Sequence, residues 1–279
     1  MYGVGCPKHY TLNMKGFIKN IALLAAFIVI FALLQLAVTI GVLSFSDGVV
    51  TDYIYMCIYF VSMLLCYTAT TLLERVTFGS VVPIDNSRRG FNPVAILTGV
   101  ILLFALSVVL APLSELLPAD SRTFPDGAFT LISIVILAPI FEEMIFRGRL
   151  YNILHRNSSP LTSASLSALA FGIVHLEPII IIEALIVGVV FSYYYIARRS
   201  IIAPIILHMC NNAFAYALHV LSYRDKSLLE LLGDGMNQTV VYATSAVIVV
   251  VCFSMMLRRM FVERRNERRV VEDEQEIDE

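Results

Sequence analysis

Long apolar runs alternate with short polar segments along most of the chain. Uncharged runs cover residues 21–46, 53–73, 90–114, 157–174 and 235–257. A helix needs roughly 20 predominantly apolar residues to cross the roughly 30 Å of bilayer hydrocarbon. The pattern therefore predicts an all-α, polytopic membrane bundle, and it disfavours a soluble helical protein.

The polar segments divide the chain into eight expected transmembrane helices. They cover residues 17–43, 53–73, 92–114, 127–150, 160–175, 178–197, 200–220 and 237–259. Turn and helix-start signals such as Asp47-Gly48, Asn92-Pro93 and Glu177-Pro178 mark several of the boundaries. The expected organisation is an N-terminal segment over 1–16, a transmembrane bundle over 17–259 and a charged, disordered tail over 260–279.

The distribution of positive charge gives this bundle an orientation. If the N-terminus is cytoplasmic, 17 of the 20 Lys and Arg residues fall on the cytoplasmic side of the predicted topology. The other side carries only Arg122, Arg224 and Lys226. Because cytoplasmic loops are enriched in Lys and Arg, both termini are expected to be cytoplasmic.

Composition agrees with a membrane protein and narrows the possible partners. Apolar residues make up 58% of the 279 positions, charged residues only 15%, and the mean hydropathy is +0.79. The five cysteines contain no CxxC pair, so neither a disulfide framework nor a zinc knuckle is expected. The lipid bilayer is the expected environment. A nucleic-acid partner is not expected. Short loops without eukaryotic sorting signals favour a bacterial inner membrane.

Two adjacent carboxylates interrupt the fourth predicted span. Charged side chains in a span are costly and are functional candidates by default. Glu143 and Arg147 are four residues apart and can pair on one helix face. Glu142 points about 100° away from Glu143. A carboxylate without a cation in apolar surroundings is a stronger base, which suits general-base catalysis. The alternative is an ion-paired helix end at the cytoplasmic interface.

Histidines occur in two further spans, each with a partner on the same helix face. Phe171 and His175 are four residues apart near the end of the fifth span, and Gly172 between them permits close helix approach. His208 and Asn212 are four apart in the seventh span and can both donate to one acceptor, as an oxyanion site requires. Each pair alone is equally compatible with hydrogen bonding between helices.

The three motifs together are more specific than any one of them. EExxxR, FxxxH and HxxxN occur in that order on three separate predicted spans, within residues 131–217. This combination resembles the CPBP family of intramembrane proteases, which includes the type II CAAX prenyl endopeptidases.

The resemblance implies a helical bundle with a cavity open to the cytoplasm, in which a peptide or membrane-protein substrate is hydrolysed. Glu142 matches the glutamate that activates water, and His175 matches the histidine that positions it. His208 and Asn212 match the pair that stabilises the oxyanion. The implied catalytic residues are Glu142, Glu143, Arg147, His175, His208 and Asn212.

The residues leave the metal dependence open. A zinc ion held by Glu142, His175 and His208 would keep a fourth position for water, as catalytic zinc sites do. In a metal-free reaction Glu142 removes the proton, and His208 with Asn212 stabilises the tetrahedral intermediate. We favour the metal-free version, although zinc is the cofactor that the alternative requires.

Helix rise tests whether these residues reach the same depth. Glu142 and His208 both lie about 10–12 Å from the cytoplasmic ends of their predicted spans at about 1.5 Å per residue. His175 lies roughly 22 Å from Pro160 by the same rise. The three residues meet only if spans four and five protrude as a hairpin or if span five tilts steeply.

Two classes of non-enzymatic function remain as alternatives. The same polar residues suit a peptide-binding immunity factor or a scaffold for a membrane partner. A transporter would use the buried carboxylates as proton or cation sites, but the chain lacks the repeated halves typical of transporters. Glu177 beside His175, and Glu183 in the sixth span, are carboxylates to which the resemblance gives no role.

Overall fold

A computed structural model describes residues 14–46, 49–86, 91–116, 125, 127–220 and 235–278. Every expected span that it describes is helical. The first three helices are α1 (Met14–Phe45), α2 (Asp52–Phe78) and α3 (Pro93–Leu116). The fourth span comprises α4 (Ala128–Ile132), α5 (Ala138–Ile145) and α6 (Tyr151–His155), joined by π-helical segments. The remaining helices are α7 (Pro160–Ile173), α8 (Pro178–Arg198), α9 (Ile202–Val220) and α11 (Met236–Asp278).

Six helical segments in the described part of the chain are long and apolar enough to cross a membrane. The other two apolar helices, 160–173 and 202–218, are shorter. The protein is therefore a polytopic helical membrane protein, as the hydropathy pattern predicts. The orientation of the termini stays a prediction.

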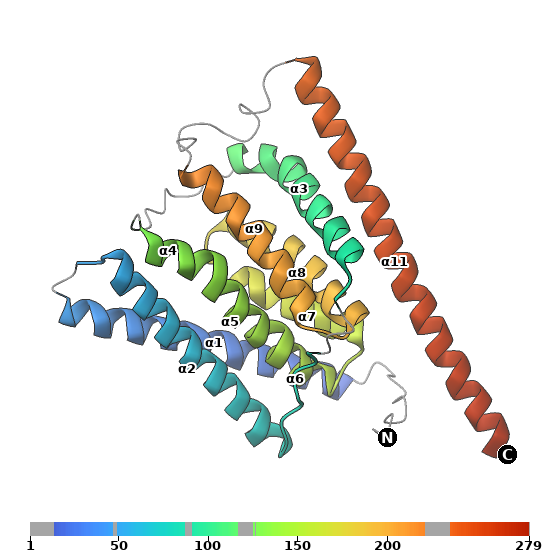
Figure 1. The fold of residues 1–279 in the computed structure, drawn as a ribbon. Coiled ribbons are helices and arrows are strands. Elements are labelled where there is room, and N and C mark those ends of the chain that lie inside the picture. The colour runs from blue at the N-terminus through green and yellow to red at the C-terminus, as the bar shows by residue number, and fades with distance from the viewer. Residues whose placement is uncertain are drawn as a thin grey trace.

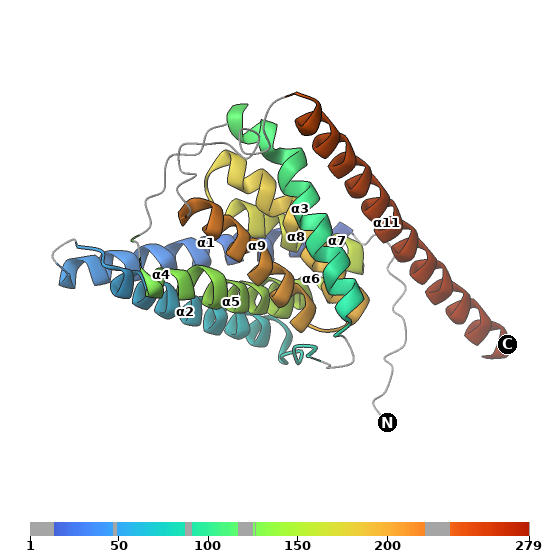
Figure 2. The same ribbon diagram turned by 45° about the horizontal axis from the view of Figure 1, so that its top comes forward.

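The helices divide into two packed groups. One apolar core joins α1, α2, α5 and α7 through residues such as Phe27, Cys66, Phe146 and Phe171. A second core joins α3, α8, α9 and α11 through residues that include Leu103 and Phe191. Figures 1 and 2 show α1 and α2 on the opposite side of the molecule from α11, with α5, α7, α8 and α9 between them. Side chains of the central helices thus meet those of both groups.

The α7–α8 hairpin packs closely because of one glycine. A Cβ atom on Gly172 would lie 2.7 Å from the carbonyl oxygen of Ile181 and 3.2 Å from Cβ of Leu185. Any larger side chain would push α7 away from α8. The close helix approach predicted at Gly172 is confirmed.

The fourth span is a continuous helix that changes its winding twice. Residues Ser133–Leu137 and Phe146–Leu150 are π-helical and flank α5. The N–H of Ala138 donates to the carbonyl of Ser133, so the next bond in that pattern would come from residue 139. Pro139 has no N–H, so the π-helical segment leaves one carbonyl to another partner.

Two expected boundaries were wrong. The fourth span does not end at residue 150 but continues as helix to His155. Arg147 and Arg149, read as interfacial charges, are 0% and 6% exposed, because both are paired inside the bundle. The segment 260–279, expected to be disordered, continues α11 as helix to Asp278. Its abundant Glu and Arg residues have good helix propensity, which favours that extension.

A buried ionic group of Glu74, Arg149 and Arg156, called the Glu74 cluster below, holds the loop after α2 in place. Glu74 is fully buried and accepts a hydrogen bond from the Val82 N–H at 2.8 Å. Its two carboxylate oxygens also bind Arg149 at 3.2 Å and Arg156 at 3.1 Å. Arg149 donates further to the Val82 carbonyl at 2.7 Å, and Arg156 to that of Ser80 at 3.0 Å. The cluster ties α2 to the end of the fourth span.

Candidate active site

The fourth span carries a buried ion pair between Glu143 and Arg147. Both side chains are 0% exposed, and Nη1 of Arg147 lies 2.8 Å from Oε1 of Glu143. Nη2 of Arg147 donates to the Gly188 carbonyl on α8 at 2.9 Å. The guanidinium also lies over the Phe171 ring, 4.6 Å from its centroid. The pairing predicted from the four-residue spacing is confirmed, and it links α5 to α7 and α8.

His208 joins this pair from α9. Its Nδ1 lies 3.0 Å from Oε1 of Glu143, and its ring stacks on Phe191 with centroids 4.8 Å apart. Because a carboxylate only accepts, Nδ1 carries the hydrogen in this contact. The Nε2 atom is thereby turned away from Glu143. The sequence did not predict this contact, since 65 positions separate the two residues.

Glu142 faces the second ring nitrogen of His208, Nε2. Its Oε2 lies 3.7 Å from Nε2 of His208, and its side chain is 14% exposed. Oε1 accepts a hydrogen bond of 2.6 Å from the Tyr59 hydroxyl of α2. The two adjacent carboxylates therefore differ as their 100° offset predicts: Glu143 is sealed in an ion pair, while Glu142 faces an imidazole and is partly accessible.

Asn212 has a partner that the sequence analysis did not anticipate. Its Nδ2 donates to the carbonyl of Ile134 at 2.9 Å. In the π-helical pattern this carbonyl would accept from residue 139, which is Pro139 and has no N–H. Asn212 thus supplies the missing hydrogen bond. The expectation that His208 and Asn212 can donate to one acceptor stays a prediction, with one N–H of Asn212 already bound to Ile134.

His175 lies just beyond α7, in the turn before α8. Its Nδ1 lies 2.7 Å from the Phe171 carbonyl, and its ring contacts the Phe171 ring edge-on at 5.0 Å between centroids. The Phe171 ring also contacts the His208 ring edge-on, with 5.7 Å between the ring centroids. A single aromatic ring therefore bridges the two histidines.

The apparent mismatch in depth disappears when the helix is measured to its true end. From His155, Glu142 is about 20 Å along the helix, close to the roughly 22 Å that separate His175 from Pro160. His208 is only about 9 Å from the start of α9 at Ile202 by the same rise. These lengths agree with the hairpin alternative, which stays a prediction.

The part of the chain that carries the three motifs matches a known family model. Residues 124–214 match the family model described as type II CAAX prenyl endopeptidase Rce1-like. An uncharacterized 24.3 kDa protein of Escherichia coli is 32% identical over 110 residues, 38% of this chain and 50% of that protein. The membrane-embedded CAAX protease MroQ of Staphylococcus aureus is 29% identical over 118 residues, 40% of this chain and 47% of that protein. YdiL of Bacillus subtilis, named as a membrane peptidase, is 28% identical over 85 residues, 30% of this chain and 35% of that protein.

The match to the family model and to these relatives supports the resemblance to the CPBP family. The aligned stretches span half or less of the length of these curated relatives. All six predicted site residues lie inside the segment that matches the family model. Tyr59 lies outside it, on a helix where the sequence showed no CPBP motif.

The residues do not form the zinc site that the sequence allows. Throughout the described part of the chain, no three His, Cys, Asp or Glu side chains gather closely enough to hold a metal ion. Glu142 and His208 face each other, whereas His175 is held to the Phe171 carbonyl. In this arrangement the set Glu142, His175 and His208 does not fit a three-ligand centre.

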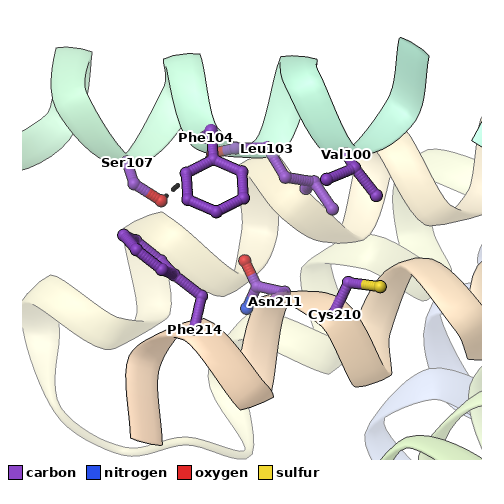
Figure 3. A pocket seen from close by; sticks show the side chains of 7 residues that line it. All are labelled: Val100, Leu103, Phe104, Ser107, Cys210, Asn211 and Phe214. Atoms are coloured by element: carbon purple, nitrogen blue, oxygen red, sulfur yellow. Dashed lines mark hydrogen bonds between the residues drawn. The ribbon is translucent and has the colours of Figure 1, made fainter. Parts of the chain in front are cut away.

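Three further polar residues that the structure describes are not bonded to the Glu142–His208 pair, although the N–H of Glu177 donates to the carbonyl of His175 at 2.9 Å. Glu183 is partly buried on α8, and no hydrogen bond or ion pair among the described residues joins it to Glu142 or His208. Glu177 is the residue that precedes α8. Next to Asn212, Asn211 points into a small hollow between α3 and α9 that is lined mainly by apolar side chains, including Phe104 and Phe214 (Figure 3). The hollow is therefore separate from the Glu142–His208 pair.

Proposed function

We propose that this protein is an intramembrane endopeptidase that uses Glu142 to activate a water molecule. The observation that carries the proposal is the division of labour between the adjacent carboxylates. Glu143 is fully buried against Arg147 and His208, while Glu142 is partly exposed and 3.7 Å from Nε2 of His208. A general base must be reachable by its water and held in position, and Glu142 meets both conditions.

The proposed reaction begins at the Glu142 carboxylate. Glu142 takes a proton from a water molecule, and the oxygen of that water bonds to the peptide carbonyl carbon. The carbonyl π bond breaks, so negative charge develops on its oxygen. The C–N bond of the tetrahedral intermediate then breaks, and the proton held by Glu142 passes to the leaving amine. The products are a carboxylic acid and an amine, with one water consumed.

Charge on the carbonyl oxygen requires hydrogen-bond donors near Glu142. A protonated imidazole donates from both nitrogens, so His208 bound to Glu143 through Nδ1 can offer Nε2–H to the oxyanion. The amide nitrogen of Asn212 carries two N–H groups, of which one reaches Ile134 and the other is available for the same oxygen. His175 serves to position the water.

The proposed substrate is a peptide or a membrane protein cut close to the cytoplasmic leaflet, in a cavity open to that side. The predicted concentration of Lys and Arg around the same ends of the helices supports this orientation. A bacterial inner membrane is the proposed location. The match of residues 124–214 to the type II CAAX prenyl endopeptidase family model supports the peptidase activity.

Cleavage by purified protein tests the proposal. The wild-type chain in detergent or proteoliposomes is screened against membrane-associated peptides beside Glu142→Ala, with Glu183→Ala as a control carboxylate outside the site. We expect Glu142→Ala to lose cleavage by about 10²–10⁴-fold and Glu183→Ala to retain it. Wild-type levels of cleavage by Glu142→Ala would refute the mechanism. Peptide binding or immunity without cleavage, surviving in Glu142→Ala, would favour the non-enzymatic alternative.

A further inference from the structure

The geometry points to Tyr59 as a positioning residue for the general base, an inference that rests on the proposed function. Tyr59 is on α2, 83 positions before Glu142, and outside the segment that matches the family model. Its hydroxyl donates to Oε1 of Glu142 across 2.6 Å. That length is typical of an O–H donor and a charged acceptor.

The two oxygens of Glu142 are held in different ways. Tyr59 occupies Oε1, whereas Oε2 faces Nε2 of His208 at 3.7 Å. The carboxylate therefore has one oxygen fixed by a strong donor and one directed toward the imidazole, beyond hydrogen-bond length. The second oxygen is the one placed to accept a proton from water. Without Tyr59 the carboxylate could rotate and exchange its oxygens.

Tyr59 is itself held by packing. Its ring lies against the core cluster of α1, α2, α5 and α7. The neighbouring Phe60 contacts Phe141 edge-on, with ring centroids 5.6 Å apart, which fixes α2 against α5 beside Glu142. A tyrosine has only two side-chain torsions, so this packing fixes the hydroxyl at little entropic cost.

Tyr59→Phe tests this role, with Tyr53→Phe as the matched control. Tyr53 is on the same helix, is 55% exposed and packs on Phe129, away from Glu142. We expect Tyr59→Phe to lower kcat/KM about tenfold. The loss should fall on kcat with KM unchanged, because Tyr59 holds the base in position and does not bind the substrate. Tyr53→Phe should leave both unchanged.

A measurement that needs no substrate separates this inference from the proposed function. Infrared difference spectra of the purified protein identify the carboxylate stretching band that disappears in Glu142→Gln. Its frequency should shift in Tyr59→Phe, because the carboxylate then lacks its O–H donor, and stay constant in Tyr53→Phe. A lower unfolding temperature with an unchanged band would reduce Tyr59 to a packing residue and overturn the inference. Cleavage that persists in Glu142→Gln would overturn the proposed function instead, whatever the spectra show.

Discussion

Two buried arginine–glutamate groups in the described part of the bundle differ in how many of their carboxylate oxygens have hydrogen-bond partners. In the Glu74 cluster both oxygens of the glutamate have partners, from two arginines and a backbone N–H. In the candidate site Glu143 uses Oε1 for both Arg147 and His208, and its buried Oε2 has no hydrogen-bond partner among the described residues. The adjacent Glu142 is bound at Oε1 by Tyr59 and stands 3.7 Å from His208 at Oε2.

This difference separates a structural group from a reactive one. A buried charge is tolerated when every lone pair is matched, and a fully matched group has little capacity left for chemistry. The site instead keeps a carboxylate oxygen and an imidazole nitrogen at a distance that leaves both available to a third molecule. Buried charge alone therefore does not distinguish the candidate active site from the Glu74 cluster, whereas the incomplete pairing beside Glu143 does.

The largest effect on stability is expected in the Glu74 cluster. Glu74→Gln leaves two arginines without their shared anion, and breaking a buried pair in this way costs about 3–5 kcal/mol. Glu142→Gln should change the free energy of unfolding by only about 1 kcal/mol or less, because glutamine still accepts from Tyr59. Unfolding in detergent compares the two variants. Equal losses of stability would contradict the division into structural and reactive groups.

A smaller effect is expected from Arg147→Lys. Lysine keeps the charge, but it lacks the planar fork that reaches Glu143 and the Gly188 carbonyl together. The expected loss of stability is about 2 kcal/mol, and cleavage should fall because Glu143 no longer fixes His208. Arg75→Lys at the exposed end of α2 is the control. If Arg147→Lys behaves like Arg75→Lys in unfolding and cleavage assays, the fork geometry is unimportant.

The dual role of Asn212 is tested by a double-mutant cycle with Pro139. Asn212→Ala leaves the Ile134 carbonyl without its donor and should cost about 1–2 kcal/mol of stability. Pro139→Ala restores a backbone N–H, so Asn212→Ala should cost much less in that background. Cleavage should remain impaired in both backgrounds if the amide also binds the oxyanion. Full recovery of cleavage would assign Asn212 to the backbone alone.

The smallest effect is expected from metal removal. The described side chains provide no three-ligand group, and the proposed reaction uses Glu142 directly. We therefore expect chelator-treated protein to cleave at the untreated rate, with zinc well below one per chain in metal analysis. Loss of cleavage on chelation, restored by added zinc, would show that the site rearranges to bind metal.

Interactions within one turn of a helix were predictable from the sequence. The Glu143–Arg147 pair follows from a four-residue spacing, and the different surroundings of Glu142 follow from the helical rotation between adjacent residues. The close approach at Gly172 is another local inference that the structure confirms. The resemblance to the CPBP family supplied the roles of the histidines, which spacing alone left open.

Contacts between distant segments were not predictable in this way. Tyr59 is one of 13 tyrosines in the chain, and nothing in its neighbourhood marks it as a partner of Glu142. Arg149 was counted as a cytoplasmic charge because the sequence does not show that Glu74, 75 positions away, neutralises it inside the bundle. The partner of Asn212 was missed because it is a backbone carbonyl released by a change in helical winding.

The sequence by itself determined that the chain forms membrane helices, where most of them begin, and which polar residues they carry. It did so because hydrophobic transfer and helical periodicity act over a single span. Only the tertiary structure decided which of two glutamates is neutralised, which tyrosine binds the other, and how far the fourth span continues. Those outcomes depend on helix packing, in which each buried polar atom must find its partner on another segment.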